Sequence, residues 1–207
     1  MIDYLTSALA TLLIVADPLL LSALFLAVTH GMSDKERREV ALRGSVIALC
    51  ILVAAGLGGA KLLELLGISL SAFRIAGGLL LLSSAAEMVF DRRSQRLQAT
   101  ADTAVSVDHV RNIAAFPLAI PLMAGPGAIT AMILLAGRSG GRTEFLAGLF
   151  AVAALVMLAC YLSFLMAERI AKIMGITGRA VITRMLGIIL AALAVQFIID
   201  GITTLIG

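Results

Sequence analysis

Charged residues divide this sequence into long apolar stretches. Between Asp3 and His30, for example, the only charged residue is Asp17. A helix needs about 20 mostly apolar residues to cross a hydrocarbon core of about 30 Å. Since these stretches are too long for the strands of a membrane β-barrel, and a helix satisfies its own backbone in lipid, we expect an all-α membrane protein. The pattern predicts six transmembrane helices, over residues 4–29, 42–63, 68–90, 113–137, 145–167 and 183–206.

Composition supports this interpretation and excludes several classes of protein. The chain is 61% hydrophobic and 14% charged, whereas a soluble domain is about 45–50% apolar and about 25% charged. So little polar surface cannot cover a fold in water, which excludes a soluble enzyme, a disordered regulator and a nucleic-acid-binding domain. We expect the lipid bilayer and no nucleic acid as its surroundings. Cys50 and Cys160 lie in apolar stretches, so no disulfide framework, metal cluster or cofactor is indicated.

The distribution of Lys and Arg predicts the orientation of the spans. Cytoplasmic loops are enriched in these residues. We therefore expect the connections after spans 1, 3 and 5 in the cytoplasm, with both termini outside, and attribute the formal net charge of +3 to topology. Glu87, one turn before Asp91, is expected to reach the cytoplasmic interface. Of the 16 Lys and Arg residues, 12 lie in these connections: Lys35, Arg37, Arg38, Arg43, Arg92, Arg93, Arg96, Arg111, Arg169, Lys172, Arg179 and Arg184.

Two motifs recur in the two halves of the chain. Spans 3 and 6 both begin with Gly-Ile-Ser/Thr, at Gly67 and Gly175, followed by Arg-x-x-Gly and an aliphatic run. Three spans per half means that the second copy enters the membrane from the opposite side. We therefore expect two inverted three-helix repeats, residues 1–90 and 113–207, joined by a cytoplasmic linker at residues 91–112.

Proline and glycine interrupt spans 1 and 4 near their centres, at Asp17-Pro18 and at Gly125-Pro126-Gly127. Proline removes a backbone N–H and clashes with the preceding turn. Corresponding interrupted helices in two inverted halves indicate the binding site of a transporter. A half-helix starting near Ala128 would present free N–H groups to an anion such as a substrate carboxylate. The alternative is a proline kink that serves packing alone.

Asp17 is the strongest single candidate for an ion- or substrate-binding residue. An aspartate at the centre of a transmembrane helix costs about 2.5–3.5 kcal/mol, so such residues usually face a polar interior. We expect a proton or sodium site at Asp17, or a part of the substrate cavity; the alternative is that it only caps the helix starting at Pro18. Asp200 is expected near the external surface, too far in depth from Asp17 for a catalytic pair, so we predict no enzyme. The candidate substrate- or ion-binding residues are Asp17, Pro18, Gly125, Pro126, Gly127, Thr130 and Gln196.

Two stretches resemble a known family. Residues 116–130, Phe-Pro-Leu-Ala-Ile-Pro-Leu-Met-Ala-Gly-Pro-Gly-Ala-Ile-Thr, look like the central signature of the MarC family of bacterial inner-membrane proteins, and residues 182–201 are similar to its last span. The resemblance covers essentially the whole chain. It implies six spans and a relationship to LysE-type exporters, and some relatives are classed as small neutral amino acid transporters. In span 1, however, Leu20, Leu21 and Ala23 replace the Gly, Asn and second Pro of the family pattern.

Together these features predict a secondary transporter of a small polar solute, with a neutral amino acid as the expected class. A proton or sodium gradient would drive it, because the sequence holds no nucleotide-binding motif. The substrate carboxylate would meet the half-helix after Gly127, and Asp17 would carry the coupling ion. The alternative is a non-transporting scaffold or regulatory protein, which the leucines in span 1 favour.

Overall fold

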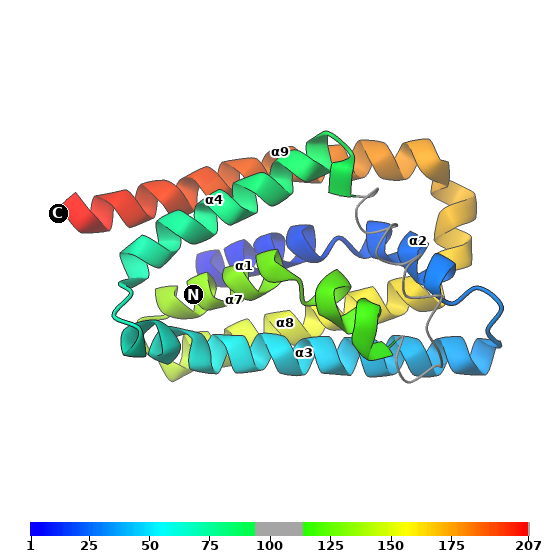
Figure 1. The fold of residues 1–207 in the computed structure, drawn as a ribbon, viewed down its shortest axis with the longest axis horizontal. Coiled ribbons are helices and arrows are strands. Elements are labelled where there is room, and N and C mark those ends of the chain that lie inside the picture. The colour runs from blue at the N-terminus through cyan, green and yellow to red at the C-terminus, as the bar shows by residue number, and fades with distance from the viewer. Residues whose placement is uncertain (94–113, 207) are drawn as a thin grey trace.

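A computed structural model describes residues 1–93 and 114–206, and its helices lie side by side in an elongated bundle (Figure 1). The described residues contain no strand. Five helices in them are long and apolar enough to cross a membrane, or six if the bent pair at residues 114–138 forms one span. The predicted all-α membrane protein is confirmed. The elements are α1 (Ile2–Ala16), α2 (Pro18–Val28), α3 (Asp34–Leu65), α4 (Leu70–Val89), η1 (Ala114–Met123), α7 (Pro126–Arg138), α8 (Thr143–Leu165) and α9 (Ala167–Ile206).

The first residues of two helices differ from the prediction. Helix α3 begins at Asp34 and not near residue 42, because Ser33 and Glu36 form a capping box there: the Ser33 backbone N–H donates to Glu36 Oε2 over 2.8 Å. A cap can start a helix in a charged segment, whereas the prediction followed only the apolar residues. Helix α9 begins at Ala167 and not near residue 183, and it is kinked at Gly175, where φ is +59°. Only residues 91–93 of the predicted linker lie within the described residues.

The first span is the central one. Its most apolar stretch is 67% buried inside the protein, compared with 28% for α3 and α4. Figure 1 shows α1 and α7 between α3 and α8 on one side and α4 and α9 on the other. A non-helical backbone at membrane depth is tolerated where protein surrounds it. The position of the first span therefore allows it to carry a break.

Helices α4 and α9 pack with their backbones in close contact. A Cβ atom on Gly78 would lie 2.8 Å from the carbonyl oxygen of Ala194, and one on Gly187 would lie 3.1 Å from that of Ala85. Gly78 precedes Ala85 along α4, whereas its partner Ala194 follows Gly187 along α9, so the two helices are antiparallel. Small residues permit this approach in membranes, where packing and not the hydrophobic effect holds helices together.

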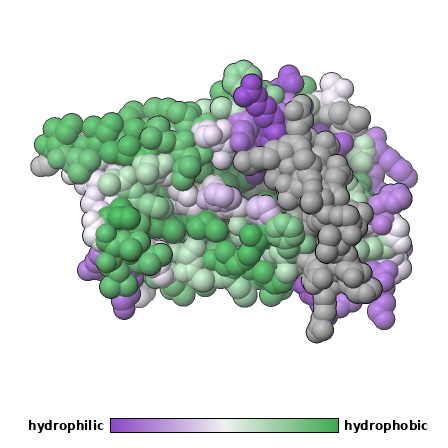
Figure 2. All heavy atoms as spheres, viewed as in Figure 1, coloured by the Kyte–Doolittle hydropathy of each residue, from purple (hydrophilic) through white to green (hydrophobic). Residues whose placement is uncertain are grey.

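The surface of the bundle fits a bilayer. Large apolar side chains such as Leu57, Leu79 and Ile188 are more than half exposed. Figure 2 shows apolar residues along the visible side of the bundle and hydrophilic residues gathered towards its ends. A soluble protein does not expose apolar surface on this scale. The exposed belt is therefore the lipid-facing surface.

Candidate functional site

The first break consists of one residue, Asp17. Helix α1 ends at Ala16, Asp17 adopts the left-handed conformation with φ +49° and ψ +71°, and α2 begins at Pro18. Aspartate tolerates this conformation better than most residues, because its side chain bonds locally. Asp17 Oδ1 accepts a hydrogen bond from the Leu20 backbone N–H over 3.2 Å. Asp17 thus caps α2, as the alternative interpretation of this residue predicts.

The Asp17 carboxylate is enclosed by protein. Its residue exposure is 0%, and Oδ2 accepts a hydrogen bond from Thr183 Oγ1 of α9 over 3.1 Å. The Arg93 guanidinium lies close enough to attract the carboxylate. An ionised group so deeply buried needs both hydrogen bonds and a nearby opposite charge. Asp17 therefore joins span 1 to span 6 and to Arg93.

The second break is longer and has no side-chain cap. Within η1 the backbone is extended at Phe116 and Ile120, and the path bends by 59° before α7 begins at Pro126. The expected start near Ala128 is wrong by half a turn, because Pro126 occupies the first helical position. Gly125 is the N-cap and offers no side chain. A Cβ atom there would lie 2.6 Å from the Pro121 carbonyl oxygen, so only glycine fits.

A cavity of about 220 Å³ opens at this second break. It lies between α1, α4 and the segment that leads from η1 into α7. Its volume is below the about 300–1,000 Å³ of pockets that take drug-sized ligands, so it suits a smaller molecule. The lining residues are Val15, Leu80, Ser83, Ser84, Glu87, Arg93, Pro121, Leu122, Met123, Gly125, Pro126, Gly127 and Ala128.

Arg93 connects the cavity with the first break. The residue is 8% exposed and lines the cavity. Its Nη2 donates to the carbonyl oxygen of Val15 over 2.5 Å, and its Nη1 contacts the Met88 sulfur at 3.1 Å. Since Val15 lies in the last turn of α1, the guanidinium is held beside Asp17 and faces the cavity at the same time.

The structure brings some of the predicted site residues together and separates others. Gly125, Pro126 and Gly127 line the cavity, whereas Asp17 lies behind it. Pro18 occupies the first turn of α2 and does not line the cavity.

Thr130 and Gln196 lie outside this cavity. Thr130 is buried, and its methyl group packs against Gly77 of α4. Gln196 is exposed on α9 and donates to Asp200 Oδ1 over 2.7 Å, while Asp200 pairs with Arg138. The Gln196 side chain therefore belongs to the polar group around Arg138, on a different part of α9 from Thr183.

Arg93 and Glu87 were not among the predicted site residues. The sequence predicts Arg93 in the connection after span 3 and Glu87 near the cytoplasmic interface, and the structure shows that both line the cavity. Nothing in the sequence separates Arg93 from its exposed neighbour Arg92, because the burial of Arg93 depends on contacts with α1. Ser83 and Ser84 were visible as the polar pair within the predicted third span, and they also line the cavity.

Comparison with known proteins identifies the family of this chain. Residues 2–206 match the model of a family described as MarC family integral membrane protein. A UPF0056 membrane protein of Archaeoglobus fulgidus is 36% identical over 202 residues, 97% of this chain and 93% of that protein. A UPF0056 membrane protein of Methanocaldococcus jannaschii is 37% identical over 203 residues, 97% of each chain, and the UPF0056 membrane protein YhcE of Escherichia coli is 35% identical over 189 residues, 90% of this chain and 86% of YhcE. No solved structure matches the chain. The protein therefore belongs to the MarC family of integral membrane proteins, as its central motif indicates.

Proposed function

We propose that this protein is a secondary transporter of a small polar solute, with a neutral amino acid as the substrate class. The observation that carries the proposal is the cavity at the second break, where the uncapped start of α7 meets a buried arginine and a glutamate. Corresponding broken helices are typical of transporter binding sites. The proposed location is the inner membrane of a bacterium, which is supported by the relative in Escherichia coli.

The chemistry of the cavity suits a zwitterion. The positive end of the α7 dipole and Arg93 attract a carboxylate. Glu87, in the last turn of α4, attracts an ammonium group, and the hydroxyl groups of Ser83 and Ser84 add neutral hydrogen-bond partners. An amino acid with an uncharged side chain carries one charge of each sign, so it matches a lining that contains one cationic and one anionic side chain.

Asp17 would couple the solute to an ion. In the ionised state its carboxylate attracts Arg93 and accepts from Thr183. Binding of a proton or sodium ion would weaken both interactions, so Arg93 would turn to the substrate carboxylate and α9 would loosen from the first break. Asp17 thus acts through Arg93, and the enclosed position of the carboxylate keeps the coupling ion separate from the solute.

Alternating access would rely on the predicted inverted repeats. Corresponding spans pack antiparallel: Gly78 meets Ala194, and the Tyr4 hydroxyl near the start of α1 donates to Leu135 near the end of α7. Gly67 and Gly175, which open the two repeated motifs, both have positive φ, +69° and +59°. These likenesses support two halves related by an axis in the membrane plane, one rocking against the other.

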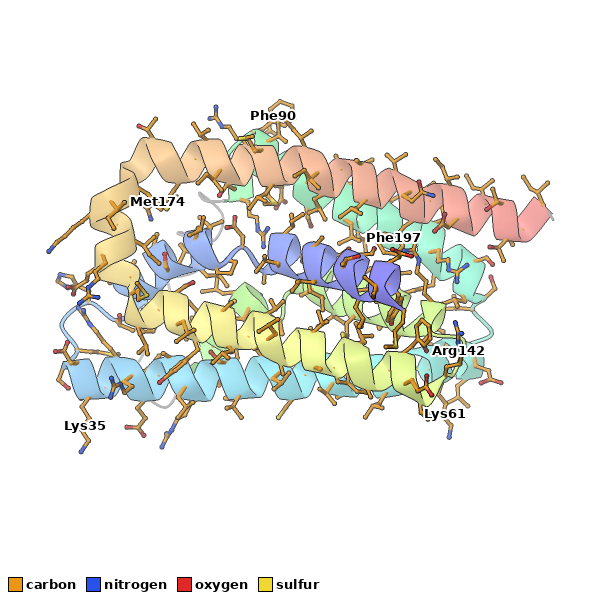
Figure 3. The ribbon with its side chains drawn as sticks, turned by 180° about the vertical axis from the view of Figure 1, so that it is seen from behind. Lys35, Lys61, Phe90, Arg142, Met174 and Phe197 are labelled. Carbon is orange, nitrogen blue, oxygen red and sulfur yellow. The ribbon has the colours of Figure 1, made fainter. Side chains whose placement is uncertain are left out.

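The proposed topology follows the positive charges. Figure 3 places Lys35 and Met174 at one end of the bundle and Lys61 and Arg142 at the other. We assign the first end, which carries the Lys- and Arg-rich connections, to the cytoplasm. Figure 1 shows both chain termini towards the other end, which supports an external location for them.

Transport by purified protein in liposomes tests the proposal. A panel of labelled neutral amino acids is offered under an imposed pH gradient or an imposed sodium gradient, and uptake that follows one of them is expected. Arg93→Gln should raise the substrate concentration for half-maximal uptake about tenfold or more, because a hydrogen bond to a charged group contributes about 1.5–3 kcal/mol. Arg92→Gln removes the same charge at an exposed neighbouring position and is the matched control, with an expected change of less than about twofold.

Asp17→Asn separates coupling from solute binding. The amide keeps the shape and the capping ability of the carboxylate. We expect binding of the solute to persist while accumulation against a gradient is lost. Unchanged gradient-driven accumulation in this variant would remove Asp17 from the mechanism. Loss of solute binding would instead assign Asp17 to the solute site.

A non-transporting scaffold or regulatory protein is the second candidate. The enclosure of Asp17 favours it, as do Leu20 and Leu21, which are buried where the resemblance implies Gly and Asn. This candidate predicts that no solute of the panel moves under either gradient and that Arg93→Gln behaves like Arg92→Gln. Gradient-driven uptake of any panel member would exclude it.

A further inference from the structure

A second and larger cavity lies at the proposed cytoplasmic end of the bundle. Its volume is about 590 Å³, and it shares no lining residue with the cavity at the second break. Helix α2 ends beside it, α3 begins there, and α8 passes into α9 there. The lining residues are Phe25, Leu26, Asp34, Lys35, Arg37, Arg38, Phe164, Leu165, Glu168 and Arg169.

The charge of this cavity is positive. Four of its lining side chains are cationic and two are anionic. Arg37 and Glu168 form an ion pair of 2.8 Å that links α3 to α9. Within the part of the chain that the structure describes, no ion pair holds Lys35, Arg38 or Arg169. The cavity therefore has two more positive than negative charges, and its guanidinium groups are able to bind a phosphate through paired hydrogen bonds.

An apolar region adjoins the charged residues. The rings of Phe25 and Phe164 stack with their centroids 4.7 Å apart and form part of the lining. Leu165 and Met166, at the end of α8, are 42% and 49% exposed. Phe25 and Phe164 are themselves buried. Since the ends of membrane-spanning helices lie at the lipid–water interface, the exposed Leu165 and Met166 are placed to contact an acyl chain while the cationic groups face the headgroup layer.

We infer that this cavity is a binding site for the headgroup phosphate of an anionic phospholipid. A basic pocket between transmembrane helices on the cytoplasmic side is a favourable site for such a headgroup. A free phosphate offers the same anionic oxygens but no acyl chain, so it would use the cationic groups and not the apolar region. A neutral phospholipid would use the apolar region but carries no net charge.

The inference is tested by binding of phosphatidylglycerol to the purified protein in detergent micelles. Native mass spectrometry counts the bound lipid, and thermal unfolding in the same micelles gives a second measurement. Arg38→Gln with Arg169→Gln removes two of the cationic groups and leaves the Arg37–Glu168 pair in place. The double variant should bind phosphatidylglycerol about tenfold or more weakly, because each basic residue near the surface of an anionic membrane contributes about 1 kcal/mol.

Lys172→Gln with Arg184→Gln is the matched control, because both residues are exposed and neither lines the cavity. It removes the same total charge and should change binding less than about twofold. If both double variants bound phosphatidylglycerol equally weakly, the inference would be overturned, because the total charge of the protein would then explain the binding. If inorganic phosphate at the same concentration raised the unfolding temperature as much as phosphatidylglycerol does, the inference would be overturned in favour of a free-anion site. If phosphatidylcholine bound as tightly as phosphatidylglycerol, the inference would be overturned in favour of an apolar contact. These measurements need no transported solute, so their failure leaves the proposed transport untouched.

Discussion

Both broken spans start a new helix at a proline, but only the first supplies a side chain for the new helix end. Asp17 closes its own break, since its carboxylate accepts from Leu20 and its backbone N–H donates to Leu13 over 3.0 Å. Gly125 has no side chain to offer, and the start of α7 remains uncapped beside a cavity. The first break is thus sealed, and the second is open.

This difference indicates where a ligand is needed. The first N–H groups of a helix have no partner within the helix, and in a bilayer there is no bulk water to satisfy them. At the first break the chain satisfies them itself. At the second, a bound molecule with anionic oxygens would do so, which is why the solute site is proposed at Gly125–Ala128 and the ion site at Asp17.

Gly125→Ala should have the largest effect on stability and transport, because it changes the backbone at the open second break. The new Cβ atom would lie 2.6 Å from a backbone oxygen, that of Pro121, so η1 and α7 must separate. We expect a loss of about 1–3 kcal/mol in the free energy of unfolding and loss of transport. Unfolding is followed by labelling of buried Cys160 with a thiol reagent in a Cys50→Ala background.

Gly127→Ala is the matched control for this change. A Cβ atom there would meet only side chains, at 3.4 Å from Val15 and 3.5 Å from Ser84, which is ordinary contact. We expect stability close to that of the original protein and weaker solute binding, because the methyl group narrows the cavity. If both variants unfolded alike, the close approach at Gly125 would have no special part in shaping the second break.

The approximate positions of the apolar helices, and the helix starts at Pro18 and Pro126, follow from local sequence. Gaps between charged residues give the apolar lengths, and proline with its neighbours gives the interruptions. The beginning of α3 at Asp34 was missed although its signal, Ser33 followed by Glu36, is also local. Hydrophobicity alone does not reveal this start, because residues 34–39 are all charged.

The lining of the cavity was only partly predictable. Arg93 and Glu87 reach it through contacts between α1, α4 and the second break, which are far apart in sequence. Thr130 and Gln196 had suitable chemistry, but the direction in which a helix presents a side chain depends on its rotation in the bundle. Thr130 packs on Gly77, and Gln196 bonds to Asp200.

Replacing Asp17 tests the role of the cap at the sealed first break and should have an intermediate effect on stability. Asp17→Ala removes the cap of α2 and places alanine in the left-handed conformation, so we expect a loss of about 1–2 kcal/mol in stability. Asp17→Asn retains the cap and tolerates the same conformation, so its loss should be smaller. Cys160 lies close enough to Asp17 for an electrostatic interaction between them. The thiol-labelling assay at Cys160 therefore also reports opening of this region. Equal losses in the two variants would show that the negative charge, and not the cap, holds the first break together.

The smallest effects are expected from the prolines that the two breaks share. Pro18→Ala and Pro126→Ala each replace the first residue of a helix, where the N–H has no partner within the helix. Each should lower stability by about 0.4–1 kcal/mol, mainly because the unfolded chain gains freedom. The first break should persist, since the positive φ and the cap belong to Asp17, and the second should persist because η1 is extended at Ile120. Transport by both variants in the liposome assay should therefore remain. A loss at Pro18→Ala larger than that of Asp17→Ala would reverse this order and assign the first break to the proline.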